Sequence, residues 1–181
     1  MKTNTLKVVV TGPESTGKST LTEWLAKHYN TVFIPEYARE YVGNLKRSYQ
    51  FEDIEHIARH QIEDMKRHIA VASGLLFIDT YLIITKVWFD VVYHCVPPWL
   101  DNAIITSDID LYLLCNTDIP WHADGIRENG GEMRENLFGR YKAELEYYGF
   151  NYRIVSGLGD QRQANARSYV DEIINHKSVK F

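Results

Sequence analysis

The sequence predicts an α/β fold in which a parallel sheet of five strands is covered by helices on both faces. Short apolar runs alternate with longer segments of helical periodicity along the 181 residues. The first run, Leu6 to Thr11, is apolar almost throughout, as expected for a strand that is buried on both faces. A glycine-containing loop follows this run directly and leads into a helical pattern. Together these observations predict a doubly wound sheet.

The remaining strands are expected at four short apolar runs: Thr31 to Ile34, Leu75 to Thr80, Leu111 to Cys115 and Tyr152 to Val155. Helices are expected between them: up to about Tyr29, from Phe51 to about Ser73, from the third strand through Val92, around 99–105, from about Glu132 to Tyr148, and after Gly159. Ligands of such sheets bind outside the carboxyl ends of the strands, so polar residues at those ends become the candidates for a site.

The loop after the first strand fits the phosphate-loop (P-loop) pattern of glycine, four free positions, glycine, lysine and serine or threonine. Its glycines allow the main chain to form a nest of N–H groups around a phosphate, and the following helix points its positive end at the same anion. We expect Lys18 to reach the β- and γ-phosphates and the Ser19 hydroxyl to bind Mg²⁺. The residues expected to bind ATP are Gly12, Pro13, Glu14, Ser15, Thr16, Gly17, Lys18, Ser19 and Thr20. The prediction is therefore a P-loop NTPase/kinase fold that uses ATP and Mg²⁺.

Carboxylates follow the second and third predicted strands. Asp79 stands where a second residue of a Mg²⁺ site is expected. Of the two carboxylates, Glu36 and Asp79, one would serve Mg²⁺ and one would accept a hydroxyl proton, and the sequence leaves open which of them is the base. Tyr37 and Arg39 come next to Glu36 and are candidates for contact with an acceptor molecule. The ordinary alternatives are a helix N-cap for Asp79 and a solvated first helical turn for Glu36 and Arg39.

A polar segment after the fourth strand, approximately residues 117–140, is predicted to be a lid. It contains Asp124 and Arg127, with Arg134 and Arg140 downstream, and its glycines permit motion. A phosphoryl-transfer lid must exclude water and bring positive charge to the transferring group, which makes Arg127 a catalytic and ATP-binding candidate. The alternative is an exposed loop with ordinary charges.

Composition narrows the class of protein. The net charge is −4, and no basic run of the kind that marks a nucleic-acid surface is present. The two cysteines form no disulfide or metal pattern, the N-terminus lacks a signal-peptide core, and no apolar run is long enough to span a bilayer. We expect one domain over residues 1–181, cytoplasmic, with no membrane or nucleic-acid partner.

Four blocks occur in a familiar order: the P-loop, Pro-Glu-Tyr-Ala-Arg-Glu-Tyr-Val at 35–42, Phe-Ile-Asp-Thr at 77–80 and Asp-Gly-Ile-Arg at 124–127. Together they resemble the ribosylnicotinamide kinase domain of the NadR-type NAD-biosynthesis proteins, among the AAA-like P-loop kinases. The resemblance implies transfer of phosphate from ATP to the 5′-hydroxyl of nicotinamide riboside, with Mg²⁺. It also implies that Glu36 and Arg39 line the acceptor site and that Asp79 serves the metal or the acceptor hydroxyl. Asp124 to Arg127 would belong to the lid, with Asp124 near the substrate.

Two positions depart from the family's pattern. Its third-strand motif usually reads Asp-Thr-Asp, and Tyr81 replaces the second acid here; Pro35 stands where some relatives have a bulky aromatic residue. Tyr37, Tyr41, Tyr81 and Trp88 are candidates to stack on a flat ring, or else core residues. A kinase of another nucleoside or metabolite, and a nucleotide-binding regulatory NTPase module, therefore stay open as alternatives.

Overall fold

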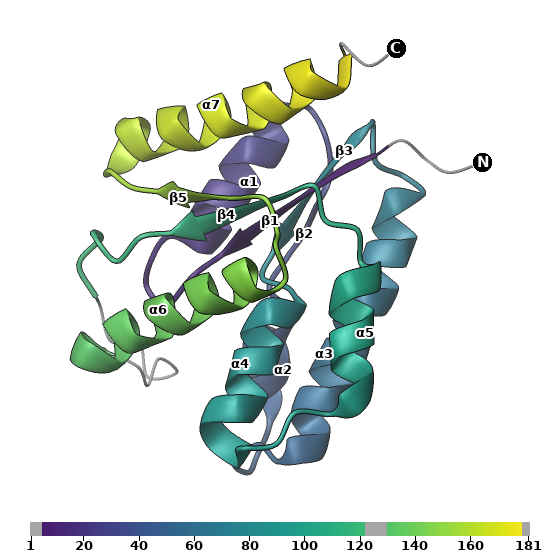
Figure 1. Ribbon diagram of the computed structural model, residues 1–181, viewed down its shortest axis with the longest axis vertical. Helices are drawn as coiled ribbons and strands as arrows, with labels where there is room; N and C mark the ends of the chain where they lie inside the picture. The colour runs from purple at the N-terminus through teal and green to yellow at the C-terminus, as the bar shows by residue number, and fades with distance from the viewer. Residues whose placement is uncertain (1–4, 122–129, 179–181) are drawn as a thin grey trace.

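The computed structural model describes residues 5–121 and 130–178, and within them a five-stranded, fully parallel sheet (Figure 1). The strands are β1 (Leu6–Thr11), β2 (Phe33–Ile34), β3 (Leu75–Asp79), β4 (Leu111–Cys115) and β5 (Tyr152–Val155). Their order across the sheet is β2-β3-β1-β4-β5, so the strand that precedes the P-loop lies in the centre. The predicted fold class is confirmed.

Helices cover both faces of this sheet. In Figure 1, α1 (Lys18–His28) and α7 (Gly159–Ser178) lie above it, and the other helices lie below. The lower group comprises α2 (Tyr37–Asn44), α3 (Phe51–Ile69), α4 (Leu82–Tyr93), α5 (Pro98–Thr106) and α6 (Gly131–Tyr147). No helix in the part of the chain that the structure describes is long and apolar enough to cross a membrane.

The alternation of side chains along each strand supplies two cores. In β1, Val8 and Val10 pack with Leu25 of α1, whereas Val9 packs on the opposite face with Ile54 of α3. All of these side chains are fully buried, and each contributes about 1.5–3 kcal/mol to folding. This burial on both faces explains why the strands read as continuous apolar runs.

Two predicted elements extend more than one residue beyond the elements that the structure shows. The second strand is shorter than Thr31 to Ile34 because only Phe33 and Ile34 pair with β3. The long helix ends at Ile69, before Ser73, and the N–H groups of Val71 and Ala72 then share the carbonyl oxygen of His68. Neither difference affects the edge of the sheet where the strands end.

Candidate active site

A cavity of about 400 Å³ opens at the carboxyl edge of the sheet, beside the end of the central strand. One end is formed by the P-loop and the start of α1, and the other by side chains of α2, α3, α4 and α6. Its lining includes every predicted ATP-binding residue from Gly12 to Thr20 except Pro13, together with Glu36 and Arg39. The position agrees with the rule for open α/β sheets.

The P-loop needs its first glycine for space as well as for conformation. Gly12 has a φ of 138°, and a Cβ added there would lie 2.8 Å from the carbonyl oxygen of Cys115. Gly17 has a φ of 73° and precedes the first turn of α1 without a side-chain cap. The first N–H groups of that helix are therefore left for a ligand at the cavity.

Lys18 is the first residue of α1 and is buried against the P-loop. Its Nζ donates a hydrogen bond of 2.9 Å to the main-chain oxygen of Pro13. Pro13, although absent from the cavity wall, thus holds the lysine through its carbonyl group. The ammonium group is bonded to the loop that would surround a phosphate, so its charge would act on the same anion as the main-chain N–H groups.

The predicted acidic and basic residues come together at one point. Burial, followed by repulsion from the Glu36 carboxylate, raises the pKa of Asp79 to about 6. A hydrogen bond from Ser19 and the positive charges of Lys18 and Arg39 act in the opposite direction. These interactions require that the ends of β1, β2 and β3 converge, as the sequence predicted.

Asp79 and Ser19 have the chemistry of a Mg²⁺ site. One carboxylate oxygen of Asp79, Oδ1, is buried without a hydrogen-bond partner within residues 5–121 and 130–178. No group of three or more His, Cys, Asp or Glu side chains suited to a metal occurs in the described residues. Magnesium commonly takes only one or two protein ligands and completes its shell with phosphates and water, so the two residues fit this ion.

Thr80 follows Asp79 in an unusual conformation. Its φ of 62° lies in the left-handed region, which β-branched residues rarely adopt. The residue is buried and lines the cavity, and its hydroxyl has no partner among the described residues. Strain of this kind gathers at functional sites, so Thr80 joins the candidates that sequence reasoning missed.

The far end of the cavity is aromatic and apolar, with one polar pair. Trp88 of α4 meets Tyr49 edge to face, with ring centroids 4.9 Å apart, and both line the cavity. Nearby, the Thr85 hydroxyl donates to Oε1 of Gln61 at 2.9 Å, and both side chains are buried in the cavity wall. With its oxygen occupied, the Gln61 amide offers its N–H donors to a ligand.

Three of the four predicted aromatic residues do not line the cavity; Trp88 does. The ring of Tyr37 stacks on His60 of α3 with centroids 3.5 Å apart, and its hydroxyl lies 3.0 Å from His56. Tyr81 is 1% exposed and belongs to the core below the sheet. The departure from the Asp-Thr-Asp motif thus replaces an acid by a core residue. Tyr41, also outside the wall, donates to Asp53.

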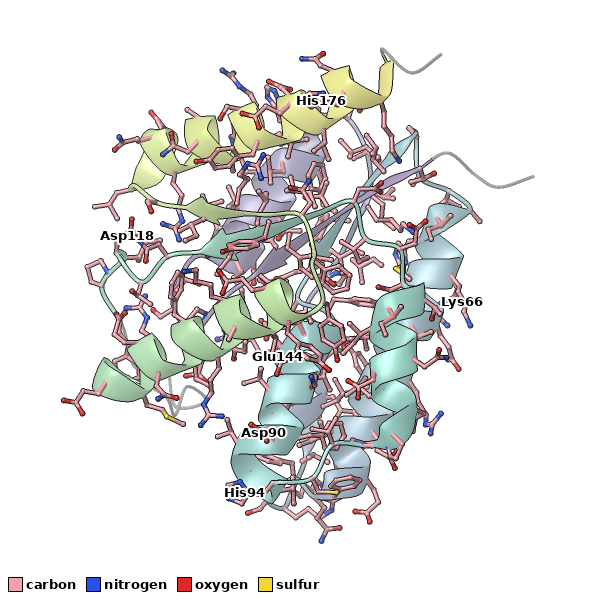
Figure 2. The ribbon with its side chains drawn as sticks, in the orientation of Figure 1. Lys66, Asp90, His94, Asp118, Glu144 and His176 are labelled. Atoms are coloured by element: carbon pink, nitrogen blue, oxygen red, sulfur yellow. The ribbon has the colours of Figure 1, made fainter. Side chains whose placement is uncertain are left out.

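The predicted lid is described only at its two ends. Asp124 and Arg127 lie outside the described residues, so their assignments stay predictions. Arg134, on α6, is 5% exposed and donates to main-chain oxygens of the P-loop and of Ile119. Arg140 lies on the surface of α6 and pairs with Asp90 of α4, which Figure 2 labels.

Comparison with known proteins identifies the family. A profile described as an AAA domain matches residues 7–162. The chain belongs to this family. The trifunctional NAD biosynthesis/regulator proteins NadR of Salmonella typhimurium and Escherichia coli are each 30% identical to it over 142 residues, which is 76% of this chain and 35% of the relative. The chain therefore spans about a third of the length of these curated relatives.

Solved structures agree with this assignment. A crystal structure of NadR in complex with NR has a TM-score of 0.81 and 26% identity, covering 93% of this chain and 51% of that one. A deoxyadenosine kinase from M. mycoides has a TM-score of 0.66 at 16% identity, a likeness of fold. The resemblance to NadR-type proteins that the motifs indicate is confirmed.

Arg162 of α7 is a further residue at the P-loop of this AAA domain that no sequence pattern predicted. It is 4% exposed and pairs with Asp118 at 2.7 Å, in the turn after β4 (Figure 2). The same side chain donates to the main-chain oxygen of Thr16 in the P-loop. No motif marks this arginine, because its other partners are carbonyl groups, which every residue carries.

Proposed function

We propose that this AAA domain transfers the γ-phosphoryl group of ATP to the 5′-hydroxyl of nicotinamide riboside, giving nicotinamide mononucleotide and ADP. One observation carries the proposal: a single cavity joins the P-loop to an aromatic end, and Glu36 and Arg39 lie in its wall. A P-loop site for ATP and a separate site for an acceptor are what a kinase requires. The likeness to NadR, including the structure in complex with NR, supports this acceptor.

The aromatic end fits a pyridine ring that carries a carboxamide. Trp88 and Tyr49 offer faces and edges for a flat ring, and apolar residues such as Ile84 and Val91 surround it. The Gln61 amide, held by Thr85, is a hydrogen-bond donor for the carboxamide oxygen. The ribose then extends towards Glu36 and Arg39, and its 5′-hydroxyl towards the P-loop.

The polar residues between the P-loop and the aromatic end would each have a separate role in phosphoryl transfer. Glu36 lines the cavity and would accept the proton of the attacking hydroxyl, while Lys18 would stabilise charge on the β- and γ-phosphates. Ser19 and Asp79 would hold Mg²⁺, which neutralises phosphate charge when bound. Arg39 orients the acceptor by hydrogen bonds to its hydroxyls or to the transferred phosphate.

A coupled assay for ADP tests the proposal against its alternatives. Wild-type protein is incubated with ATP, Mg²⁺ and, separately, nicotinamide riboside, uridine, adenosine or no acceptor, and products are identified by mass spectrometry. We expect ADP and nicotinamide mononucleotide in equal amounts with nicotinamide riboside. Turnover of another riboside alone would retain the kinase and reject the acceptor. Slow hydrolysis of ATP at a rate that no acceptor changes would favour a regulatory NTPase.

A further inference from the structure

Every main-chain carbonyl of the P-loop from Pro13 to Gly17 accepts a hydrogen bond. The oxygen of Pro13 accepts from the Thr16 hydroxyl at 2.8 Å and from Nζ of Lys18 at 2.9 Å. The oxygen of Gly17 accepts from the backbone N–H of Leu21 as α1 begins. The three carbonyls between them, at positions 14, 15 and 16, are held by two arginine side chains from distant helices.

Arg134 of α6 holds the first two of these carbonyls. Its Nε donates to the oxygen of Glu14 at 3.0 Å, and one terminal nitrogen donates to the oxygen of Ser15 at 2.9 Å. The same terminal nitrogen donates to the oxygen of Ile119 at 2.8 Å. One planar guanidinium group therefore fixes two consecutive peptide units of the P-loop and connects them to the segment after β4.

Arg162 of α7 holds the third carbonyl. One terminal nitrogen donates to the oxygens of Thr16 at 2.9 Å and Asn116 at 3.0 Å. The other donates to Asp118 at 2.7 Å and to the oxygen of Gly157 at 3.0 Å. Burying a cation is unfavourable without such bonds, and these four hold both terminal nitrogens, whereas Nε is buried with no partner among the described residues. The bonds of the terminal nitrogens fix the side chain as well as the loop.

A peptide unit is planar, and its C=O and N–H groups point in opposite directions. Carbonyls of residues 14–16 that are bound on one side therefore direct the N–H groups of residues 15–17 to the other side, and Ser15, Thr16 and Gly17 line the cavity. We propose that Arg134 and Arg162 are positioning residues that hold the P-loop in its phosphate-binding form before a nucleotide arrives. This inference deepens the proposed function, since it concerns how the same site takes the phosphates of ATP.

Lysine variants test the inference, because lysine keeps the charge but cannot hold two carbonyls with a planar fork. Arg134→Lys and Arg162→Lys are compared with wild type by calorimetry, using inorganic tripolyphosphate, ATP and nicotinamide riboside as separate ligands. We expect the Kd values for tripolyphosphate and ATP to rise about tenfold or more, with the riboside Kd within about twofold. Arg167→Lys, an exposed arginine five positions further along α7, is the matched control and should leave all three values unchanged.

Thermal unfolding of each variant separates positioning from stability. A lower Tm with unchanged phosphate affinity would overturn the inference, as would equal weakening of all three ligands. Amide NMR signals of residues 15–17 in the ligand-free wild type provide a test without any variant: sharp single signals are expected, and signals broadened until ADP is added would contradict a preformed loop. Tripolyphosphate binding needs no acceptor, so these results do not depend on whether nicotinamide riboside is the substrate.

Discussion

The two ends of the cavity are built in different ways. The phosphate end consists of neighbouring residues, Gly12 to Thr20, that act largely through main-chain groups. The aromatic end is the proposed acceptor site and is called the acceptor end below. It is assembled from side chains of four helices that lie far apart in the sequence. These side chains include Arg39, Gln61, Trp88 and Tyr141. Main-chain groups are common to all residues, so the phosphate end depends on conformation, whereas the acceptor end depends on residue identity. If the proposed function is correct, discrimination among acceptors should therefore reside in the helices below the sheet.

Removal of the P-loop ammonium group should have the largest effect. In Lys18→Ala, kcat/KM should fall by roughly 10²–10³-fold, because a preorganised charge on the transferring phosphate is lost. Initial rates and thermal unfolding are measured together. Lys27→Ala, on the exposed side of the same helix, is the control. Activity within tenfold of wild type would show that the phosphate end does not depend on this charge.

Asp79 should give the phosphate end its pH dependence. In wild type, kcat/KM for MgATP should fall on the acid side with a midpoint near the Asp79 pKa of about 6, because the protonated carboxyl is a poor Mg²⁺ ligand. Asp79→Asn should be roughly 10²-fold less active and lose this limb of the profile. Asp90→Asn, on the surface of α4, should retain it. An unchanged Mg²⁺ requirement in Asp79→Asn would assign Asp79 to the fold alone.

The same carboxyl should also affect stability. Its pKa is raised on folding from 3.8 to about 6, so between these values the folded state binds more protons than the unfolded state. The free energy of unfolding of the ligand-free protein should therefore gain up to roughly 3 kcal/mol from this group as pH falls from about 7 to 4. Asp79→Asn should lack that gain and be more stable than wild type at pH 8, as urea titrations at several pH values can test.

Loss of the Trp88 ring should weaken binding of the acceptor but not of ATP. Trp88→Ala should raise KM for nicotinamide riboside by about 5- to 100-fold, the range expected for a lost ring-stacking contact, and leave the Kd for ATP within about twofold. Trp88→Phe, which keeps a ring, should lie near wild type. If Trp88→Ala weakened ATP and riboside equally, the division of the cavity into two ends would be wrong.

Loss of the hydrogen bond between Thr85 and Gln61 should have the smallest effect on KM. Thr85→Val keeps the shape of the side chain but removes the hydroxyl that holds Gln61. We expect KM for nicotinamide riboside to rise about two- to tenfold, the usual size of one hydrogen bond, with no change for a riboside that lacks a carboxamide. Thr106→Val, on the exposed side of α5, serves as the control. The same change for both ribosides would mean that the pair supports packing only.

The phosphate end could be predicted from the sequence because its residues are contiguous and its context is a strand followed by a helix. The convergence of Glu36 and Asp79 followed from one rule about parallel strands. Gln61 and Thr85 could not be found in this way, since periodicity identifies the buried face of a helix but not which buried positions border a cavity. The charge of Arg134 was expected to act on the transferring phosphate, yet the structure bonds it to carbonyl groups, whose positions no sequence pattern reveals.

The central place of β1 has a consequence for how the protein folds. Leu6 pairs with Leu75 and Val8 pairs with Leu111, so the strand before the P-loop obtains both neighbours from segments that are far from it in the sequence. Such long-range pairing of parallel strands is intrinsically slow, because the loop-closure entropy is lost before the contacts form. During synthesis, the P-loop leaves the ribosome well before the strands that flank it. Arg134 and Arg162, which hold the P-loop carbonyls, come later still, on α6 and α7. Nucleotide capture by the nascent chain should therefore begin only after α7 has emerged, which makes it a reporter of completed folding.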